Sequence, residues 1–356
     1  MNATLLVGGY TGETGAGRGI EAVSQAADAA LSSLGTAAVA DSPSFLARHP
    51  RLGVVYAVCE MTPEVRAFSI DGPEDAAAVT LNPLGAAWRT ASDVCHVAVD
   101  PDGQWIVTSS YGDGLVQLFT LDADGAIVAG FDGTAAVDYA AAEANTEPRP
   151  SRAHAALVLP DGRIATTDLG HDLLRVWSVG LVELGDGERY ELTLDQELAL
   201  PAGSGPRLLE LHPSGHIYIV TEYSVELLIV APDADGTTYA LVGMLPVLAG
   251  GEAPAEGDTG AHISIDAGAG RAYVSVRKRN TLHTFGISED GNALHPLAEI
   301  ATGGNWPRHH LQHEGQIHVA NQLSNTVTTF VLDGEGIPSV QLGELTLGAP
   351  TCVIAL

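Results

Sequence analysis

The fold is decided by residues 205–231, which read GPRLLELHPSGHIYIVTEYSVELLIVA. Three strand-like runs follow one another here, at 208–211, 217–221 and 226–231, and the turn HPSG at 212–215 separates the first two. β-Branched and aromatic residues in short runs, punctuated by Gly and Pro, indicate strands rather than helices. The segment therefore predicts consecutive short strands joined by tight turns.

The same unit recurs along the chain. Other copies begin at 42–43, 95–96, 152–154, 261–262 and 306–308, and their turns fall at Pro50, 100–103, 160–162, 266–270 and 313–315. Third strands are expected to end at Asp71, Asp122, Asp233 and Asp333. The spacing of roughly 46 to 59 residues suits a four-stranded propeller blade better than a leucine-rich, ankyrin or tetratricopeptide unit.

The two ends of the chain supply the last blade. Six copies are internal, and the strand-like stretches at 5–10 and 351–355 together complete a seventh. Pairing the termini in one sheet would remove the exposed edges of an open array. We therefore expect an all-β fold, a seven-bladed β-propeller with four-stranded antiparallel blades, and one domain spanning 1–356. The Ala-rich runs at 22–38 and 135–144 are compatible with a helical turn, and we interpret both as outer-strand or loop excursions.

Composition excludes several classes of partner. The chain has 46% hydrophobic residues, 41 Gly and 19 Pro, and its formal charge is −28. Nucleic acids and anionic membranes bind basic surfaces, so neither is an expected partner. We interpret the negative charge as that of a solubilising acidic surface.

The cysteines and the hydropathy pattern bear on location. Cys59, Cys95 and Cys352 are odd in number and widely separated, which fits reduced thiols rather than a disulfide framework. No signal sequence is evident, and no apolar run approaches about 18 residues. We expect a soluble, cytoplasmic protein that is a monomer or a weak homo-oligomer.

Ionisable residues recur at two positions of the repeat. In an antiparallel blade, the start of the first strand and the end of the second lie at the same end of the sheet, next to the central channel. The first position holds His96, Arg152 or His154, Arg207, His262 and Arg308; the second holds Glu60, Tyr111, Asp168, Glu222, Arg277 and Asn321. Strand ends are commonly polar, but several arginines at equivalent positions in an acidic protein predict a pocket for an anionic ligand.

Several strings resemble the lactonase family of seven-bladed propellers. They are GSGPR at 203–207, TE at 221–222, CHVAVDPDG at 95–103, SSYG at 109–112 and VANQ at 319–322. The resemblance extends from GGYTG at 8–12 to the terminal strand. That family includes propeller-type 6-phosphogluconolactonases of the cytosol and a fungal carboxymuconate cyclase.

The resemblance implies four catalytic residues, His154, Arg207, Glu222 and Arg277. The chain also departs from the family pattern at three positions. The family has His at position 208, Asn at 221 and Asn or Asp at 276, whereas this chain has Leu, Thr and Val there. Arg152 likewise replaces a common polar neighbour of His154. These departures leave the substrate open. We expect His96, Tyr111, Arg152, His262 and Arg308 to contact it.

Lactone hydrolysis needs a base that activates water, a cradle for the oxyanion and an acid for the departing ring oxygen. Either His154 or Glu222 can transfer protons, and our hypothesis takes Glu222 as the base and His154 as the acid or orienter. Arg207 and Arg277 bind the anionic group and the developing oxyanion.

We expect neither a cofactor nor a metal. The glycine-rich residues 8–19 lack the Gly-Lys-Ser/Thr of a phosphate loop, and His309, His310 and His313 are poorly spaced for metal binding on a strand. No Gly-x-Ser-x-Gly elbow occurs.

The leading functional hypothesis is hydrolysis of an anionic sugar lactone, with 6-phosphogluconolactone as the expected substrate. One alternative is a lactonase or cycloisomerase for another carboxylated lactone, such as a muconolactone. The other is a non-catalytic propeller that binds a ligand or protein, because fold alone does not choose a function.

Overall fold

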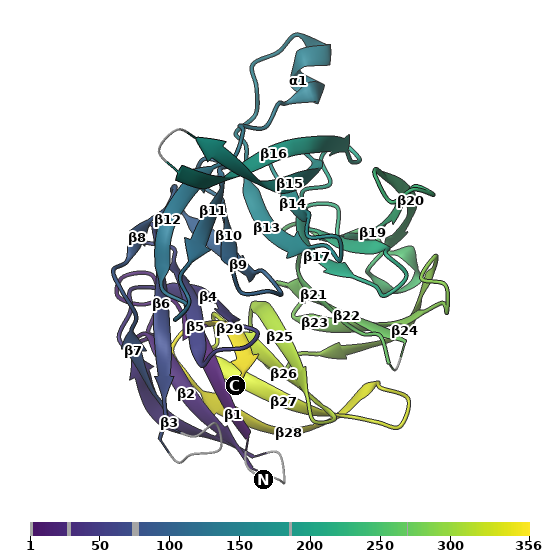
Figure 1. Cartoon of the computed structure of the whole chain (residues 1–356). Coiled ribbons are helices and arrows are strands. Elements are labelled where there is room, and N and C mark those ends of the chain that lie inside the picture. Colours follow the sequence, from purple (N-terminus) through teal and green to yellow (C-terminus); the bar gives the residue numbers. More distant parts are fainter. Residues whose placement is uncertain (1–2, 27–29, 73–77, 185–186, 269) are drawn as a thin grey trace. The chain divides into compact units, whose positions relative to one another are not determined.

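The computed structural model describes residues 3–26, 30–72, 78–184, 187–268 and 270–356 (Figure 1). The strands form seven sheets, which are the seven blades of the predicted β-propeller. The chain divides into two compact units: unit 1 comprises Met1–Ser44, Asp71–Leu81 and Arg207–Leu356, and unit 2 comprises Phe45–Ile70 and Asn82–Pro206.

Unit 1 holds four sheets of four strands. In spatial order they are β29 (Pro350–Ala355), β1 (Ala3–Gly9), β2 (Ile20–Gln25), β3 (Leu31–Ala38); β17 (Pro206–Leu211), β18 (Ile217–Thr221), β19 (Glu226–Pro232), β20 (Tyr239–Pro246); β21 (Thr259–Asp266), β22 (Arg271–Arg277), β23 (Thr281–Ile287), β24 (Leu294–Ala301); and β25 (Pro307–His313), β26 (Gln316–Asn321), β27 (Thr326–Leu332), β28 (Pro338–Thr346).

The other three sheets belong mainly to unit 2. They are β4 (Pro43–Arg48), β5 (Val54–Cys59), β6 (Glu64–Asp71), β7 (Thr80–Pro83), with the short β8 (Trp88–Arg89) also on β6; β9 (Val94–Val99), β10 (Trp105–Ser110), β11 (Val116–Leu121), β12 (Ile127–Asp132); and β13 (Ala153–Val158), β14 (Ile164–Asp168), β15 (Leu173–Leu184), β16 (Gly187–Ala199).

The two ends of the chain pair in one sheet, as predicted. Strand β29 runs antiparallel to β1, with Leu5 opposite Ala355 and Val7 opposite Val353. Leu5, Val7 and Val353 are buried together in one hydrophobic cluster. The last blade is therefore held by both main-chain pairing and side-chain burial.

The turns also follow the sequence. In the 100–103 turn the Gly103 N–H donates to Asp100 O (2.8 Å), and Asp100 Oδ2 accepts from Gln104 N (3.0 Å). Gly103 has φ 69°, a left-handed conformation that glycine adopts without strain. The turns at 160–162 and 212–215 place Gly162 and Gly215 in the same region.

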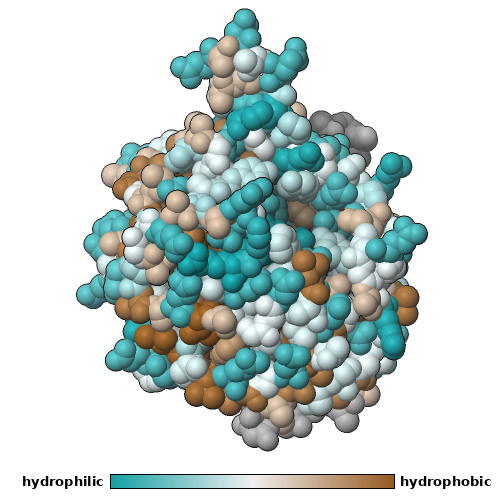
Figure 2. All heavy atoms as spheres, turned by 180° about the vertical axis from the view of Figure 1, so that it is seen from behind, coloured by the Kyte–Doolittle hydropathy of each residue, from teal (hydrophilic) through white to brown (hydrophobic). Residues whose placement is uncertain are grey.

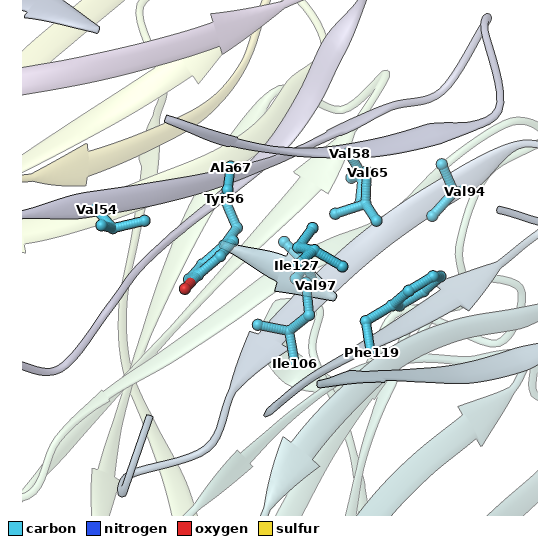
Figure 3. Close-up of a cluster of buried hydrophobic side chains, with 10 residues drawn as sticks. All are labelled: Val54, Tyr56, Val58, Val65, Ala67, Val94, Val97, Ile106, Phe119 and Ile127. Carbon is cyan, nitrogen blue, oxygen red and sulfur yellow. The ribbon is translucent and has the colours of Figure 1, made fainter. Parts of the chain in front are cut away.

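Each blade core is built from apolar strand residues. Figure 3 shows the cluster that joins the β4–β7 and β9–β12 sheets of unit 2, where Tyr56, Val58, Ile106 and Phe119 are buried together. Neighbouring blades are also joined by a recurring bond: a second-strand tyrosine hydroxyl donates to a glycine carbonyl in the third turn of the next blade. The pairs are Tyr56 to Gly125 (2.8 Å), Tyr218 to Gly291 (2.8 Å) and Tyr273 to Gly336 (2.6 Å).

The two Ala-rich runs differ in structure. Residues 22–38 lie in outer strands β2 and β3 where they are described, whereas the run at 135–144 lies in the connection between β12 and β13 and contains the short helix α1 (Tyr139–Ala144), which projects beyond β16 (Figure 1). Asp138 caps the helix, accepting from Ala141 N at 3.2 Å, and Arg149 binds Asp138 at 2.9 Å. An aspartate cap before alanines favours a helical turn over a strand.

The surface and the remaining helix add two observations. Exposed apolar side chains include Val242 and Met244 on β20 and Val340 on β28, and Figure 2 shows hydrophobic residues interspersed with hydrophilic ones on one face. The other helix is the short η1 (Ala249–Gly251). Among the described residues, no helix has the length and apolar character needed to span a membrane.

Candidate active site

The predicted site residues occupy equivalent positions in their blades. His96, His154, Arg207, His262 and Arg308 lie near the starts of the first strands β9, β13, β17, β21 and β25. Glu60, Tyr111 and Glu222 directly follow the second strands β5, β10 and β18, whereas Asp168, Arg277 and Asn321 end β14, β22 and β26. The register confirms that these two positions adjoin, because Ala153 pairs with Asp168 and Pro307 with Asn321.

Unit 1 brings three of the four expected catalytic residues into contact. Glu222 Oε2 accepts from Arg207 Nε at 3.0 Å and lies 2.7 Å from Arg277 Nη2. The side chains of Arg207 and Arg277 are 4% and 8% exposed, and that of Glu222 is 16% exposed. We call Arg207, Glu222 and Arg277 the arginine–glutamate cluster. One carboxylate oxygen thus joins two buried guanidinium groups.

Main-chain carbonyls at the start of strand β21 bind the two arginines of the cluster. Arg207 Nη1 donates to the Ala261 carbonyl, and Arg277 Nη2 donates to the Gly260 carbonyl at 3.3 Å. The Gly260 N–H in turn donates to the main-chain oxygen of Glu222 at 3.1 Å. A Cβ on Gly260 would lie 2.1 Å from Thr221 O, so this close approach requires glycine.

The electrostatics of the cluster keep Glu222 ionised. Burial raises the pKa of Glu222, but the charges of Arg277 and Arg207 act against it and hold the pKa below its usual value. Burial also lowers the pKa of Arg277. A buried carboxylate stays charged when opposite charges lie this close. Glu222 is therefore a charged acceptor and a weak proton acceptor.

Two aromatic residues flank the arginines of unit 1. The Arg277 guanidinium carbon lies 5.4 Å from the centroid of the Trp306 ring, and that of Arg308 lies 5.2 Å from the Tyr10 ring. Both distances fall within the range of cation–π contacts. Arg308 is close enough that its charge also lowers the pKa of Glu222.

His262 belongs to a group of buried histidines whose rings are in contact. Its ring centroid lies 3.9 Å from that of His309 and 4.4 Å from that of His310. His309 Nδ1 accepts a 3.4 Å hydrogen bond from Val353 N. Burial lowers the pKa of His309 and of His310 to about 3, so both are neutral at neutral pH.

Unit 2 holds a second group, formed by His154, Tyr111 and Arg152. The Arg152 guanidinium carbon lies 4.7 Å from the Tyr111 ring centroid, and Nη1 donates to the carbonyls of Tyr111 (3.0 Å) and Gly112 (3.1 Å). The Tyr111 and His154 rings meet edge to face at 6.2 Å. Part of the donor capacity of Arg152 therefore serves the backbone of the loop after β10.

His96 packs within the same unit. Its ring centroid lies 4.2 Å from that of Phe45, and its Nδ1 accepts from Ala156 N at 3.3 Å. The neighbouring Cys95 donates its thiol to the carbonyl of His154 at 3.4 Å. His96 and His154 are both buried.

Sequence reasoning overlooked some contributors. It did not assign roles to the Trp306 and Tyr10 rings or to the Gly260 and Ala261 carbonyls. Trp306 stands in the WPR triplet that opens the last internal repeat, so an aromatic residue at that position was a usable signal. The gathering of His154 with the arginine–glutamate cluster stays a prediction, as do the roles of the individual residues.

Comparisons with known proteins identify a family and similar folds. A family model described as a lactonase with a 7-bladed β-propeller matches residues 4–355. An uncharacterised protein of Lactococcus lactis is 27% identical over the full length of both chains. A 6-phosphogluconolactonase of Bacillus subtilis is 24% identical, over 91% of this chain and 90% of its own. The structure of a periplasmic gluconolactonase of Pseudomonas aeruginosa superimposes with a TM-score of 0.85 at 20% identity, covering 100% of this chain and 99% of that one.

Proposed function

The chain belongs to the lactonase family of seven-bladed β-propellers, and from this premise we propose that it hydrolyses an anionic sugar lactone, with 6-phosphogluconolactone as the substrate. The observation that carries the proposal is the arginine–glutamate cluster, in which two buried guanidinium groups share one carboxylate oxygen. The relative in Bacillus subtilis named 6-phosphogluconolactonase supports the choice of substrate.

The positive charges in and beside the cluster favour an anionic ligand. Arg207 and Arg277 of the cluster, and the nearby Arg308, all lower the pKa of Glu222 through their charges. Guanidinium groups bind phosphate and carboxylate through paired N–H donors. In a chain with a net charge of −28, such a group of arginines is a locally positive feature.

The arginines also suit the transition state. Water attack on the lactone carbonyl forms a tetrahedral oxyanion, which preorganised donors in a buried site stabilise. Among the described residues, Arg277 Nε has no hydrogen-bond partner although it is buried. We assign that N–H to the oxyanion or to the anionic group of the substrate.

The proton transfers fall to His154 more readily than to Glu222. A general base works best when its pKa lies near the working pH, and the pKa of Glu222 is lowered by its two arginine partners. We therefore give Glu222 the task of holding the two guanidinium groups in place. The assignment of His154 rests on the family resemblance of its position, and it revises the hypothesis that Glu222 is the base.

A rate measurement on purified protein tests the proposal. Arg207→Met keeps the length and apolar stem of the side chain but removes its donors, so we expect turnover to fall by about 10²- to 10³-fold. Arg51→Met is a matched control, because Arg51 is exposed and binds Asp102 at 2.5 Å. Proton release above the spontaneous rate is the readout, and near-normal turnover by Arg207→Met would remove Arg207 from the mechanism.

A second substrate class is a carboxylated lactone such as a muconolactone, because arginine donors fit a carboxylate as well as a phosphate. Comparing kcat/KM on phosphorylated, carboxylated and uncharged lactones separates the two. We place the phosphorylated reaction in the cytoplasm, as a step of the oxidative pentose phosphate pathway. Cys59, Cys95 and Cys352 are buried thiols, which supports a reducing compartment.

A further inference from the structure

The backbone at Trp306 is unusual for so large a residue. Trp306 has φ 66°, in the left-handed region, and it directly precedes the proline that starts β25. Three other residues with a left-handed backbone directly precede a proline that starts a strand. They are Ser42 (φ 47°) before β4, Gly205 (φ 63°) before β17 and Ala349 (φ 40°) before β29. The left-handed junction is therefore a feature of the repeat.

Among these four junctions, Trp306 is the one with a large side chain. Ser42, Gly205 and Ala349 are small, and glycine adopts a left-handed backbone most readily. A bulky residue there is an outlier whose cost the surrounding structure must offset. The left-handed backbone of Trp306 therefore costs free energy, and we expect a contact of its indole ring to offset that cost.

That contact is with Arg277 of the arginine–glutamate cluster, 5.4 Å from its guanidinium carbon to the ring centroid. The Trp306 backbone is bonded to a side chain in the turn that follows Arg277. Asn280, in the turn that follows Arg277, accepts from the Trp306 N–H through Oδ1 at 2.8 Å. The Trp306 carbonyl accepts from Gln322 N at 3.0 Å. Hydrogen bonds to both the N–H and the carbonyl of Trp306 therefore fix its backbone while the ring lies over the guanidinium group.

We propose that Trp306 is a positioning residue that stacks on the Arg277 guanidinium and leaves its N–H edge for the anionic group or oxyanion of the substrate. A ring binds the face of a guanidinium group, whereas carboxylates, phosphates and oxyanions bind its edge. Arg277 Nη2 bonds to Glu222 and Gly260, and Nε has no partner among the residues the structure describes. The consequence for catalysis rests on the proposed lactonase function.

Two variants separate positioning from packing. Trp306→Gly removes the ring and suits the left-handed backbone, as Gly205 does at its own junction, so the melting temperature should hold or rise. Its kcat/KM on a phosphorylated lactone should fall about tenfold, within the range of about 2- to 30-fold that a cation–π contact contributes. Trp306→Phe keeps a ring and should stay within about threefold of the wild type.

Controls and failures are distinguishable. Ala349→Gly makes the same backbone change at a junction outside the cluster, and should leave kcat/KM unchanged. Positioning is refuted when Trp306→Gly keeps wild-type kcat/KM, or loses it only in step with a fall in melting temperature.

An independent readout covers the case in which the wild-type protein turns over no lactone. That outcome overturns the proposed function and leaves the role of Trp306 to be read from the Arg277 Nε–Hε resonance, identified by its absence in Arg277→Lys. Stacking predicts a ring-current shift that disappears in Trp306→Gly and persists in Trp306→Phe. An Nε–Hε resonance at the same position in the wild type and in Trp306→Gly would overturn the inference.

Discussion

Mild acid should destabilise the fold through histidines that are buried without charge. His283, His309, His310 and His318 are 2%, 7%, 1% and 0% exposed. Burial lowers the pKa of His309 and His310 to about 3 and that of His283 and His318 to about 4. In the unfolded chain each takes up a proton near pH 6.5. The folded state gains no proton in the same range, so its stability declines as the pH falls below about 6.5.

The magnitude follows from the two pKa values. Each histidine contributes stability that is complete above its unfolded pKa, and about 1.4 kcal/mol is lost for each pH unit below it. At pH 5.0 the loss is about 2 kcal/mol for each residue and about 8 kcal/mol for the four. Glu210 opposes this loss, because burial raises its pKa to about 7 and the folded chain binds that proton first. This gain is about 2 kcal/mol, which leaves a net loss of about 6 kcal/mol.

Thermal unfolding at pH 7.5 and 5.0 measures the effect. For a chain of this length, a loss of about 6 kcal/mol corresponds to a fall in melting temperature of about 8 °C. Asp233 and Asp290 contribute little in this window, since their pKa values are about 2. His310→Leu should cut the net loss by about a third, whereas the exposed His295→Gln should not alter it. Equal melting temperatures at both pH values would refute the reasoning.

Three further outcomes follow from single contacts. Tyr218→Phe should cost about 1–3 kcal/mol in unfolding free energy, because it leaves the Gly291 carbonyl without its 2.8 Å donor; an unchanged melting temperature would show that the inter-blade bond adds nothing. Asp138→Ala removes the cap of α1 and the partner of Arg149, so limited proteolysis should cut within 138–149 sooner than in the wild type. Glu222→Gln should destabilise by about 3–5 kcal/mol as well as slow turnover, because two buried arginines lose their shared anion; stability equal to the wild type would contradict the burial argument.

Local signals made the blades predictable. Turns such as 100–103 and 212–215 combine proline, aspartate or serine with a glycine that takes φ above zero, and these residues specify the turn whatever surrounds them. The pairing of β1 with β29 was also predictable, because two short apolar ends left one blade incomplete. Helix α1 was predictable only as a possible helical turn within a loop, because its signal is one aspartate cap before a short alanine run, which a loop tolerates equally well.

Side-chain partnerships were harder to predict than strand positions. The repeat placed Arg207, Glu222 and Arg277 at strand ends, but it did not reveal that one oxygen of Glu222 serves both arginines and so lowers its pKa. Nor did it show that Arg152 donates to the carbonyls of its neighbouring loop. Such contacts depend on rotamers and on backbone approaches between blades, which no periodicity in the sequence encodes.

The most direct test of the central claim is the rate at which the purified wild-type protein opens 6-phosphogluconolactone above the spontaneous reaction, beside Arg207→Met and the uncharged gluconolactone. The account predicts turnover by the wild type, a loss of about 10²- to 10³-fold in Arg207→Met, and a preference for the phosphorylated substrate. Equal rates for the wild type and Arg207→Met, or no rate above the spontaneous one on any anionic lactone, would contradict it.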